Sequence, residues 1–181
     1  LNRSSFFCPV GLIATLPHIA WLDLGAVFVR PDSGLKRFTG YTIEGIRGWP
    51  QVAQALLEAH PTLGVHELVQ IAPARQIAPV EWRFWIAEHQ VIGQAQYSWY
   101  MLNERNEAES VPEQVLALAL EIAQRYEAPH PIYVLDVVQS EGDVFANELN
   151  AFSTSGLYNV DVSSLMPAAR EVILRDAKDN F

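Results

Sequence analysis

The pattern of hydrophobic and polar positions along the chain predicts six strands. The run AVFVR, at residues 26–30, is apolar up to its last position and is broken by Pro31 and Gly34, which is typical of a buried strand. Three later runs are rich in aromatic and branched residues, and two more flank the turn sequence SEGD, which predicts a hairpin. The predicted strands cover residues 26–30, 66–71, 81–88, 91–102, 132–139 and 143–150.

Helical periodicity predicts three helices among these strands. In WPQVAQALLEAH, residues 49–60, Pro50 suits a first turn and the apolar residues share one face. Ser110 and Glu113 have capping-box spacing before a helix at about 111–126, and a last helix is expected at about 164–176. This order of elements predicts a mixed α+β domain with a largely antiparallel sheet.

Composition indicates a folded protein that needs no covalent staples. The 181 residues are 50% hydrophobic, which suffices for one domain or two closely packed lobes. The single cysteine, Cys8, excludes an internal disulfide and is expected to be a small buried hydrophobe, as suits the reducing cytoplasm. No run of about 18 apolar residues is present, so we expect a soluble chain without a spanning helix.

The chain is acidic, and its few lysines stand out. A formal net charge of -9 disfavours sequence-independent binding to nucleic acid or to an anionic membrane. The only lysines are Lys36 and Lys178. Lys36 and Arg37 follow Arg30 across a serine and glycine turn in VFVRPDSGLKRFTG, residues 27–40. We therefore expect a local cation cluster there, able to meet an anionic ligand.

Carboxylate and amide side chains gather on the predicted hairpin. Glu148 and Asn150 share a strand face, and AFSTSGLY follows them as a loop of small polar residues suited to ligand contacts. A three-residue turn would set Asp136 opposite Glu148, whereas a turn of two or four residues would turn Asp136 to the other face. The first arrangement makes an oxygen site that suits Mg²⁺. The alternative is an ordinary exposed hairpin face.

A second polar pair occurs in EWRFW, where Glu81 and Arg83 share one strand face and Trp82 and Phe84 share the other. Arg83 is explained by a cross-strand ion pair or, alternatively, by a guanidinium that forks onto phosphate or carboxylate. The five histidines are scattered, and the sequence has neither a Gly-x-Ser-x-Gly motif nor a Walker P-loop. Nucleophilic hydrolysis and P-loop chemistry therefore have no support.

Taken in order, these segments resemble the ATP-grasp superfamily. The resemblance covers about residues 26–160 and lies in VFVRP....K.FTG, ELVQIA, EWRFWI with VIGQAQY, LDV and FANELN. It implies an α+β ATP-grasp fold, in which two lobes of mostly antiparallel sheet with packed helices grip the nucleotide between them. The implied domain spans residues 26–176, with lobe one at about 26–70 and lobe two at about 71–176. Residues 1–25 would be an N-terminal segment or the remnant of a preceding region, and residues 177–181 a tail.

The resemblance also implies roles for single residues, with Arg83 and Lys36 as the catalytic pair. The implied ATP ligands are Arg30 and Lys36 at the phosphates, Glu67, Val69, Gln70 and Ile71 around the adenine, and Arg83 at the phosphate or acyl phosphate. The implied ligands of Mg²⁺, or of Mn²⁺ in its place, are Asp136, Glu148 and Asn150. Family members usually carry a lysine where Arg30 stands.

Most ATP-grasp enzymes activate a carboxylic acid as an acyl phosphate, which an amine or thiol then attacks. The resemblance thus implies an ATP- and Mg²⁺-dependent carboxylate–amine ligase acting on small-molecule or peptide substrates. A kinase of the same fold and a non-catalytic nucleotide-binding or interaction module are the alternatives. We expect a cytoplasmic protein without nucleic-acid or membrane partners, in which Trp99, Tyr100 and Met101 could mark a homodimer interface.

Overall fold

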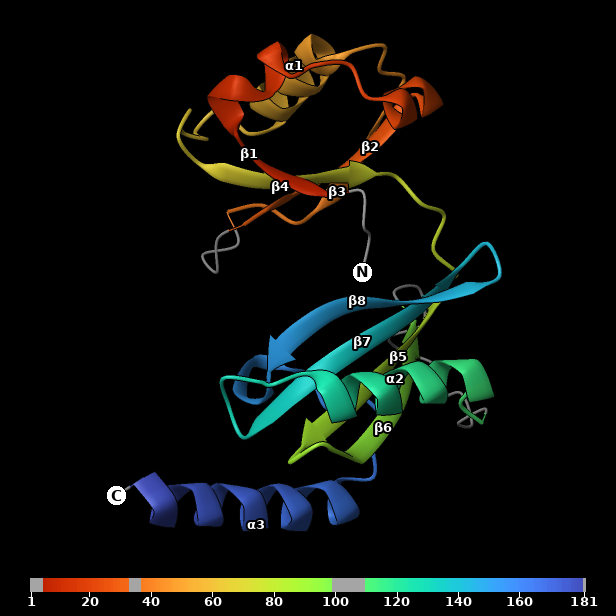
Figure 1. Cartoon of the computed structure of the whole chain (residues 1–181), viewed down its shortest axis with the longest axis vertical. Coiled ribbons are helices and arrows are strands. Elements are labelled where there is room, and N and C mark those ends of the chain that lie inside the picture. Colours follow the sequence, from red (N-terminus) through yellow and green to blue (C-terminus); the bar gives the residue numbers. More distant parts are fainter. Residues whose placement is uncertain (1–4, 33–36, 99–109, 181) are drawn as a thin grey trace. The chain divides into compact units, whose positions relative to one another are not determined.

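The computed structural model describes residues 5–32, 37–98 and 110–180, and the chain forms two compact units (Figure 1). The N-terminal unit is Asn2–Arg75 and the C-terminal unit is Gln76–Phe181. Each unit contains one four-stranded antiparallel sheet with helices against it. The α+β class and the antiparallel pairing predicted from the sequence are confirmed.

The sheet of the N-terminal unit has the strand order β1-β4-β2-β3. Its strands are β1 (Phe6–Pro9), β2 (Ala26–Pro31), β3 (Tyr41–Glu44) and β4 (Leu68–Pro73). Its helices are α1 (Trp49–Ala59) and the short 3-10 helices η1 (Val10–Thr15) and η2 (Ala20–Leu24). Residues 6–24, which precede the domain predicted from the sequence, thus supply an edge strand and two helices to this unit.

One face of this sheet packs into a core and the other does not face α1. Val27, Val29 and Ile71 are fully buried, and they pack with Val52 and Leu56 of α1. Pro50 stands in the first turn of α1, where its missing N–H costs nothing. In Figure 1, α1 and the two short helices lie on one side of the sheet. Side chains that alternate with the core positions therefore point away from these helices.

The sheet of the C-terminal unit has the order β6-β5-β7-β8. Its elements are β5 (Val80–Ala87), β6 (Gln90–Ser98), α2 (Glu113–Arg125), β7 (Ile132–Ser140), β8 (Asp143–Ala151), η3 (Phe152–Thr154) and α3 (Val162–Asn180). On one face, Trp82 and Phe84 pack with Val115 of α2. On the other face, Trp85 packs with Leu165 of α3. This two-sided burial explains why β5 is hydrophobic on both faces.

The two long helices of this unit begin differently from the sequence expectation. The predicted capping box at Ser110 is not formed, because Pro112 is the N-cap of α2 and no side chain in the described part of the chain caps it. Before α3, Asp161 accepts hydrogen bonds from the backbone N–H of Ser163 at 3.0 Å and from the hydroxyls of Ser163 and Ser164. These bonds, that of the Ser163 hydroxyl first, lower the pKa of Asp161. The helix continues to Asn180, beyond its predicted end and through most of the expected tail.

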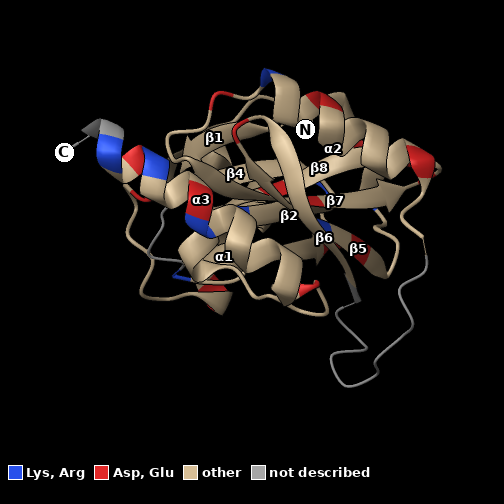
Figure 2. Cartoon of the chain, turned by 90° about the horizontal axis from the view of Figure 1, so that it is seen from below, with Lys and Arg blue, Asp and Glu red and all other residues tan. Residues whose placement is uncertain are grey.

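Charged residues of both signs follow one another along α3 (Figure 2). Arg175 of this helix pairs with Glu88, in the turn after β5, at 2.9 Å, which ties the helix to the sheet edge. No helix in the described ranges is long and apolar enough to cross a membrane. Trp99, Tyr100 and Met101, predicted to mark a homodimer interface, lie outside the described residues.

Candidate functional site

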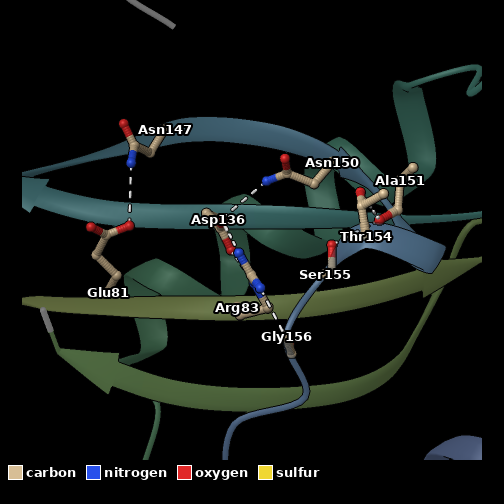
Figure 3. Close-up of polar contacts among 9 residues, drawn as sticks. All are labelled: Glu81, Arg83, Asp136, Asn147, Asn150, Ala151, Thr154, Ser155 and Gly156. Carbon is tan, nitrogen blue, oxygen red and sulfur yellow. Dashed lines mark hydrogen bonds and ion pairs between the residues drawn. The ribbon is translucent and has the colours of Figure 1, made fainter. Parts of the chain in front are cut away.

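A buried ion pair lies within the sheet of the C-terminal unit (Figure 3). Arg83 on β5 is directly opposite Asp136 on β7. Its Nε donates to Asp136 Oδ1 at 2.7 Å and its Nη2 donates to Oδ2 at 2.6 Å. The side chains of Arg83 and Asp136 are only 8% and 2% exposed. Two parallel charge-assisted bonds therefore hold the guanidinium in the plane of the carboxylate.

The segment after β8 completes the surroundings of this pair. The Arg83 Nη1 donates to the carbonyl oxygen of Gly156 at 3.2 Å, and the ring centroid of Tyr158 lies 4.8 Å from the Arg83 Cζ. Asn150 on β8 donates its Nδ2 to Asp136 Oδ2 at 3.3 Å. The guanidinium thus has partners from β5's neighbour strand and from the loop that joins β8 to α3.

The hairpin of β7 and β8 contains a β-bulge that decides which residues face this pair. Its turn has two residues, since Ser140 pairs with Asp143. Regular pairing from such a turn would set Asn147 opposite Asp136. The register instead shifts between Asp136 and Val137, and Glu148 pairs with Asp136. Asn147 is therefore the extra residue of the bulge, and an even turn still produces the pair that the sequence analysis linked to an odd one.

The bulge residue makes a contact of its own. Asn147 donates its Nδ2 to Glu81 Oε2 at 3.2 Å. Glu81 is buried and lies two residues before Arg83 on β5, hence on the same face. Figure 3 shows the resulting polar row across β5, β7 and β8, with Glu81 and Asn147 at one end and Asn150 at the other.

Asp136, Glu148 and Asn150, the predicted metal ligands, are brought together by this register. Among the described residues, no group of three or more His, Cys, Asp and Glu is placed to hold a metal ion. Two carboxylates and one amide nevertheless fit Mg²⁺, which takes few protein ligands and fills its shell with water and phosphate oxygens. Glu148 is half-buried, whereas both oxygens of Asp136 already accept hydrogen bonds from Arg83. Any ion held here would share Asp136 with Arg83.

The predicted ATP ligands of the N-terminal unit divide between two faces of its sheet. Arg30 on β2 is directly opposite Gln70 on β4, on the face that does not pack on α1. Gln70 also donates its Nε2 to the Ser5 hydroxyl at 3.1 Å. The side chains of Val69 and Ile71 point into the core and are buried, so that only their backbone is available to a ligand.

The predicted cation cluster is partly engaged in the protein itself. The Nε of Arg37 lies 3.3 Å from Glu67 Oε2, and the backbone N–H of Gly64 donates to Glu67 Oε1 at 2.9 Å. Glu67, predicted at the edge of the adenine segment, thus closes the turn before β4. A Cβ on Gly40 would lie 2.6 Å from the Phe28 ring, so a glycine is needed where this loop returns over β2. Lys36 lies outside the described residues.

A family comparison accounts for both sheets together. The model of an ATP-grasp domain family, the third family of its clade, matches residues 10–170. The chain belongs to this ATP-grasp family. Comparison with curated proteins gave no significant match.

Solved structures share the fold of this ATP-grasp domain at low identity. A RimK domain ATP-grasp protein from Sphaerobacter thermophilus aligns with a TM-score of 0.59 and 17% identity, over 93% of this chain and 57% of that one. D-alanine–D-alanine ligase from Bacillus anthracis, in complex with ATP, aligns with 0.58 and 16%, over 99% and 62%. The ATP-grasp ligase PsnB, in complex with a minimal precursor, Mg and ADP, aligns with 0.54 and 16%, over 96% and 53%. The chain thus spans less than two thirds of each of these proteins.

Three residues that contact the polar row were not candidates in the sequence analysis, namely Asn147, Gly156 and Tyr158. One sequence signal for the bulge does exist. Val144 and Ala146 are apolar at even positions of β8, whereas Leu149, which pairs with Leu135 of the same core, is at an odd one. A change of parity within one strand indicates an extra residue between the two sets.

Proposed function

We propose that this ATP-grasp domain belongs to an ATP- and Mg²⁺-dependent ligase that joins a carboxylate to an amine through an acyl phosphate. The observation that carries the proposal is the buried, fixed guanidinium of Arg83 beside the oxygen atoms of Asp136, Glu148 and Asn150. Family membership supports ATP as the nucleotide. The ligase PsnB, similar in fold, was solved with Mg and ADP, and its partner there is a minimal precursor.

Arg83 would bind the transferring phosphate and the acyl phosphate. Phosphoryl transfer depends mainly on position and on charge stabilisation, which a held guanidinium supplies without reorganisation. Asp136 fixes the plane of that guanidinium, and Glu148 and Asn150 would hold Mg²⁺ with it. When bound, Mg²⁺ neutralises charge on the phosphate oxygens.

In the N-terminal unit, Arg30 would contact phosphate and Gln70 would contact the nucleotide from the strand opposite. Val69 and Ile71 would offer backbone groups to the adenine, because their side chains belong to the core. Burial raises the pKa of the Cys8 thiol, which removes it as a nucleophile at neutral pH. The attacking amine would therefore come from a substrate, either a small molecule or a peptide.

The test is Glu148→Gln, which keeps the size of the side chain and removes its charge. We expect Mg²⁺-dependent ADP release from ATP to fall by about 100-fold or more, since the metal contributes several kcal/mol to such reactions. Glu141→Gln, in the turn of the same hairpin, is the matched control and should leave the rate unchanged. The assay uses pools of candidate acids and amines with MgATP.

Unchanged ADP release in Glu148→Gln, with a normal circular dichroism spectrum, would refute the metal assignment. A requirement for both an acid and an amine supports the ligase. ADP release that needs no amine and leaves a phosphorylated product supports the kinase instead.

A further inference from the structure

Tyr158 has a backbone conformation that no hairpin turn explains. Four non-glycine residues in the described part of the chain have positive φ angles, and they are Glu88, His89, Glu141 and Tyr158. The first three are central residues of the two-residue turns between β5 and β6 and between β7 and β8. Such turns require this conformation. Tyr158, with φ of 48°, instead lies in the loop between η3 and α3.

This conformation accompanies a close packing of the ring on Arg83. The ring centroid is 4.8 Å from the Arg83 Cζ, and a Cβ on Gly156 would lie 3.4 Å from the ring. The ring therefore lies against the backbone whose carbonyl oxygen accepts from Arg83 Nη1. Asp136 and Gly156 thus hold the guanidinium through its N–H groups, while Tyr158 covers one of its faces.

The ring is in contact with a buried charge, and Tyr158 is itself 43% exposed. A left-handed backbone is disfavoured for a residue with a large side chain and is far better tolerated by Asn or Gly. A tyrosine here therefore lowers stability relative to those residues. Strain of this kind persists where the surrounding site uses it.

We propose that Tyr158 is a positioning residue for Arg83, and that its strained backbone is retained to keep the ring on the guanidinium. The inference rests on the proposed function, in which Arg83 binds the transferring phosphate. An aromatic face next to Arg restricts the tilt of the guanidinium and shields it from water. The ring acts through Arg83 and has no chemical step of its own.

The test compares Tyr158→Asn with Tyr158→Phe and with Glu141→Asn. Asn relieves the left-handed strain at either position, but only at position 158 does it remove a ring from Arg83. Phe keeps the ring. Two readouts are used on the full chain: the exchange rate of the Arg83 Nε–H by NMR, and the Kd for MgATP by calorimetry, each beside the melting temperature.

In Tyr158→Asn we expect a melting temperature equal to or above that of the wild type, faster exchange of the Arg83 Nε–H, and a Kd for MgATP weaker by roughly tenfold, within the range of a desolvated cation–π contact. Glu141→Asn should match the first effect and show neither of the others. Tyr158→Phe should resemble the wild type in all three.

A lower melting temperature in Tyr158→Asn with unchanged Arg83 exchange would overturn the inference, because the ring would then be only structural. Unchanged exchange together with unchanged Kd would overturn it as well. A wild-type chain that binds no MgATP, yet shows the expected exchange difference, would refute the proposed function while supporting the positioning of Arg83 by Tyr158.

Discussion

At the scale of single residues, the main finding is that two separately predicted roles share one ion pair. The sequence analysis assigned Arg83 to phosphate and Asp136 to metal, with a cross-strand ion pair as the alternative for Arg83. The structure shows that ion pair, with both Asp136 oxygens accepting from Arg83. The two interpretations are compatible, since a paired Asp136 orients the guanidinium and retains oxygen lone pairs. The choice of partner was not readable from sequence, because it depends on the β5–β7 register.

Replacing Asp136 by Ala should lower the free energy of unfolding by about 3–5 kcal/mol, because it leaves the buried Arg83 guanidinium without its counter-charge. Urea denaturation monitored by tryptophan fluorescence measures the loss. The double variant Arg83→Met with Asp136→Leu removes both charges and should be far less destabilised. If the single and double variants were equally stable, the pair would not be desolvated in the way the structure indicates.

At the scale of elements, the long strands and helices were predictable and the short ones were not. The apolar runs behind β2 and β5 and the turn sequence between β7 and β8 are strong local signals. β1 and β3 have four residues each, too few for a periodicity to show, and β1 is defined by its pairing with β4. The start of α2 was misassigned because Pro112 takes the place expected for a capping side chain.

The register of β8 gives a prediction about the bulge residue. Deleting Asn147 should leave a regular ladder in which Glu148 still pairs with Asp136, because the deletion removes the extra residue alone. We expect a loss of about 1.5 kcal/mol for the hydrogen bond to Glu81, with the Kd for MgATP nearly unchanged. Deleting Leu149 is the control, since it would turn Asn150 to the α2 face and weaken MgATP binding. Urea denaturation and calorimetry measure the two quantities.

Equal loss of MgATP binding in both deletions would contradict this account. Asn147 would then matter through its own side chain, and the position of Glu148 would not depend on the bulge. Cross-strand NOEs between Asp136 and Glu148 report the register directly, and they should persist after deletion of Asn147 and be the same as in the wild type.

At the scale of the whole molecule, two units with separate cores each carry part of the predicted site. The N-terminal sheet presents Arg30 and Gln70 side by side, and the C-terminal sheet presents the row around Arg83 and Asp136. The resemblance to the ATP-grasp family pointed to both sets, since it rests on the order of segments along the whole chain. It did not indicate which side chains belong to a core, and Val69 and Ile71 show this most clearly.

The scarcity of lysine supports a prediction for Lys36. The chain has a formal net charge of -9 and only two lysines, so a lysine in the segment after Arg30 is expected to serve an anion. Lys36→Ala should weaken MgATP binding by roughly tenfold, which reduces the stabilisation by saturating MgATP by about 1.4 kcal/mol and shrinks the rise in melting temperature. Lys178→Ala removes the same charge from α3 and should leave that rise unchanged. Equal rises in wild type, Lys36→Ala and Lys178→Ala would exclude Lys36 from the phosphate site, because the two variants differ only in where the charge is lost.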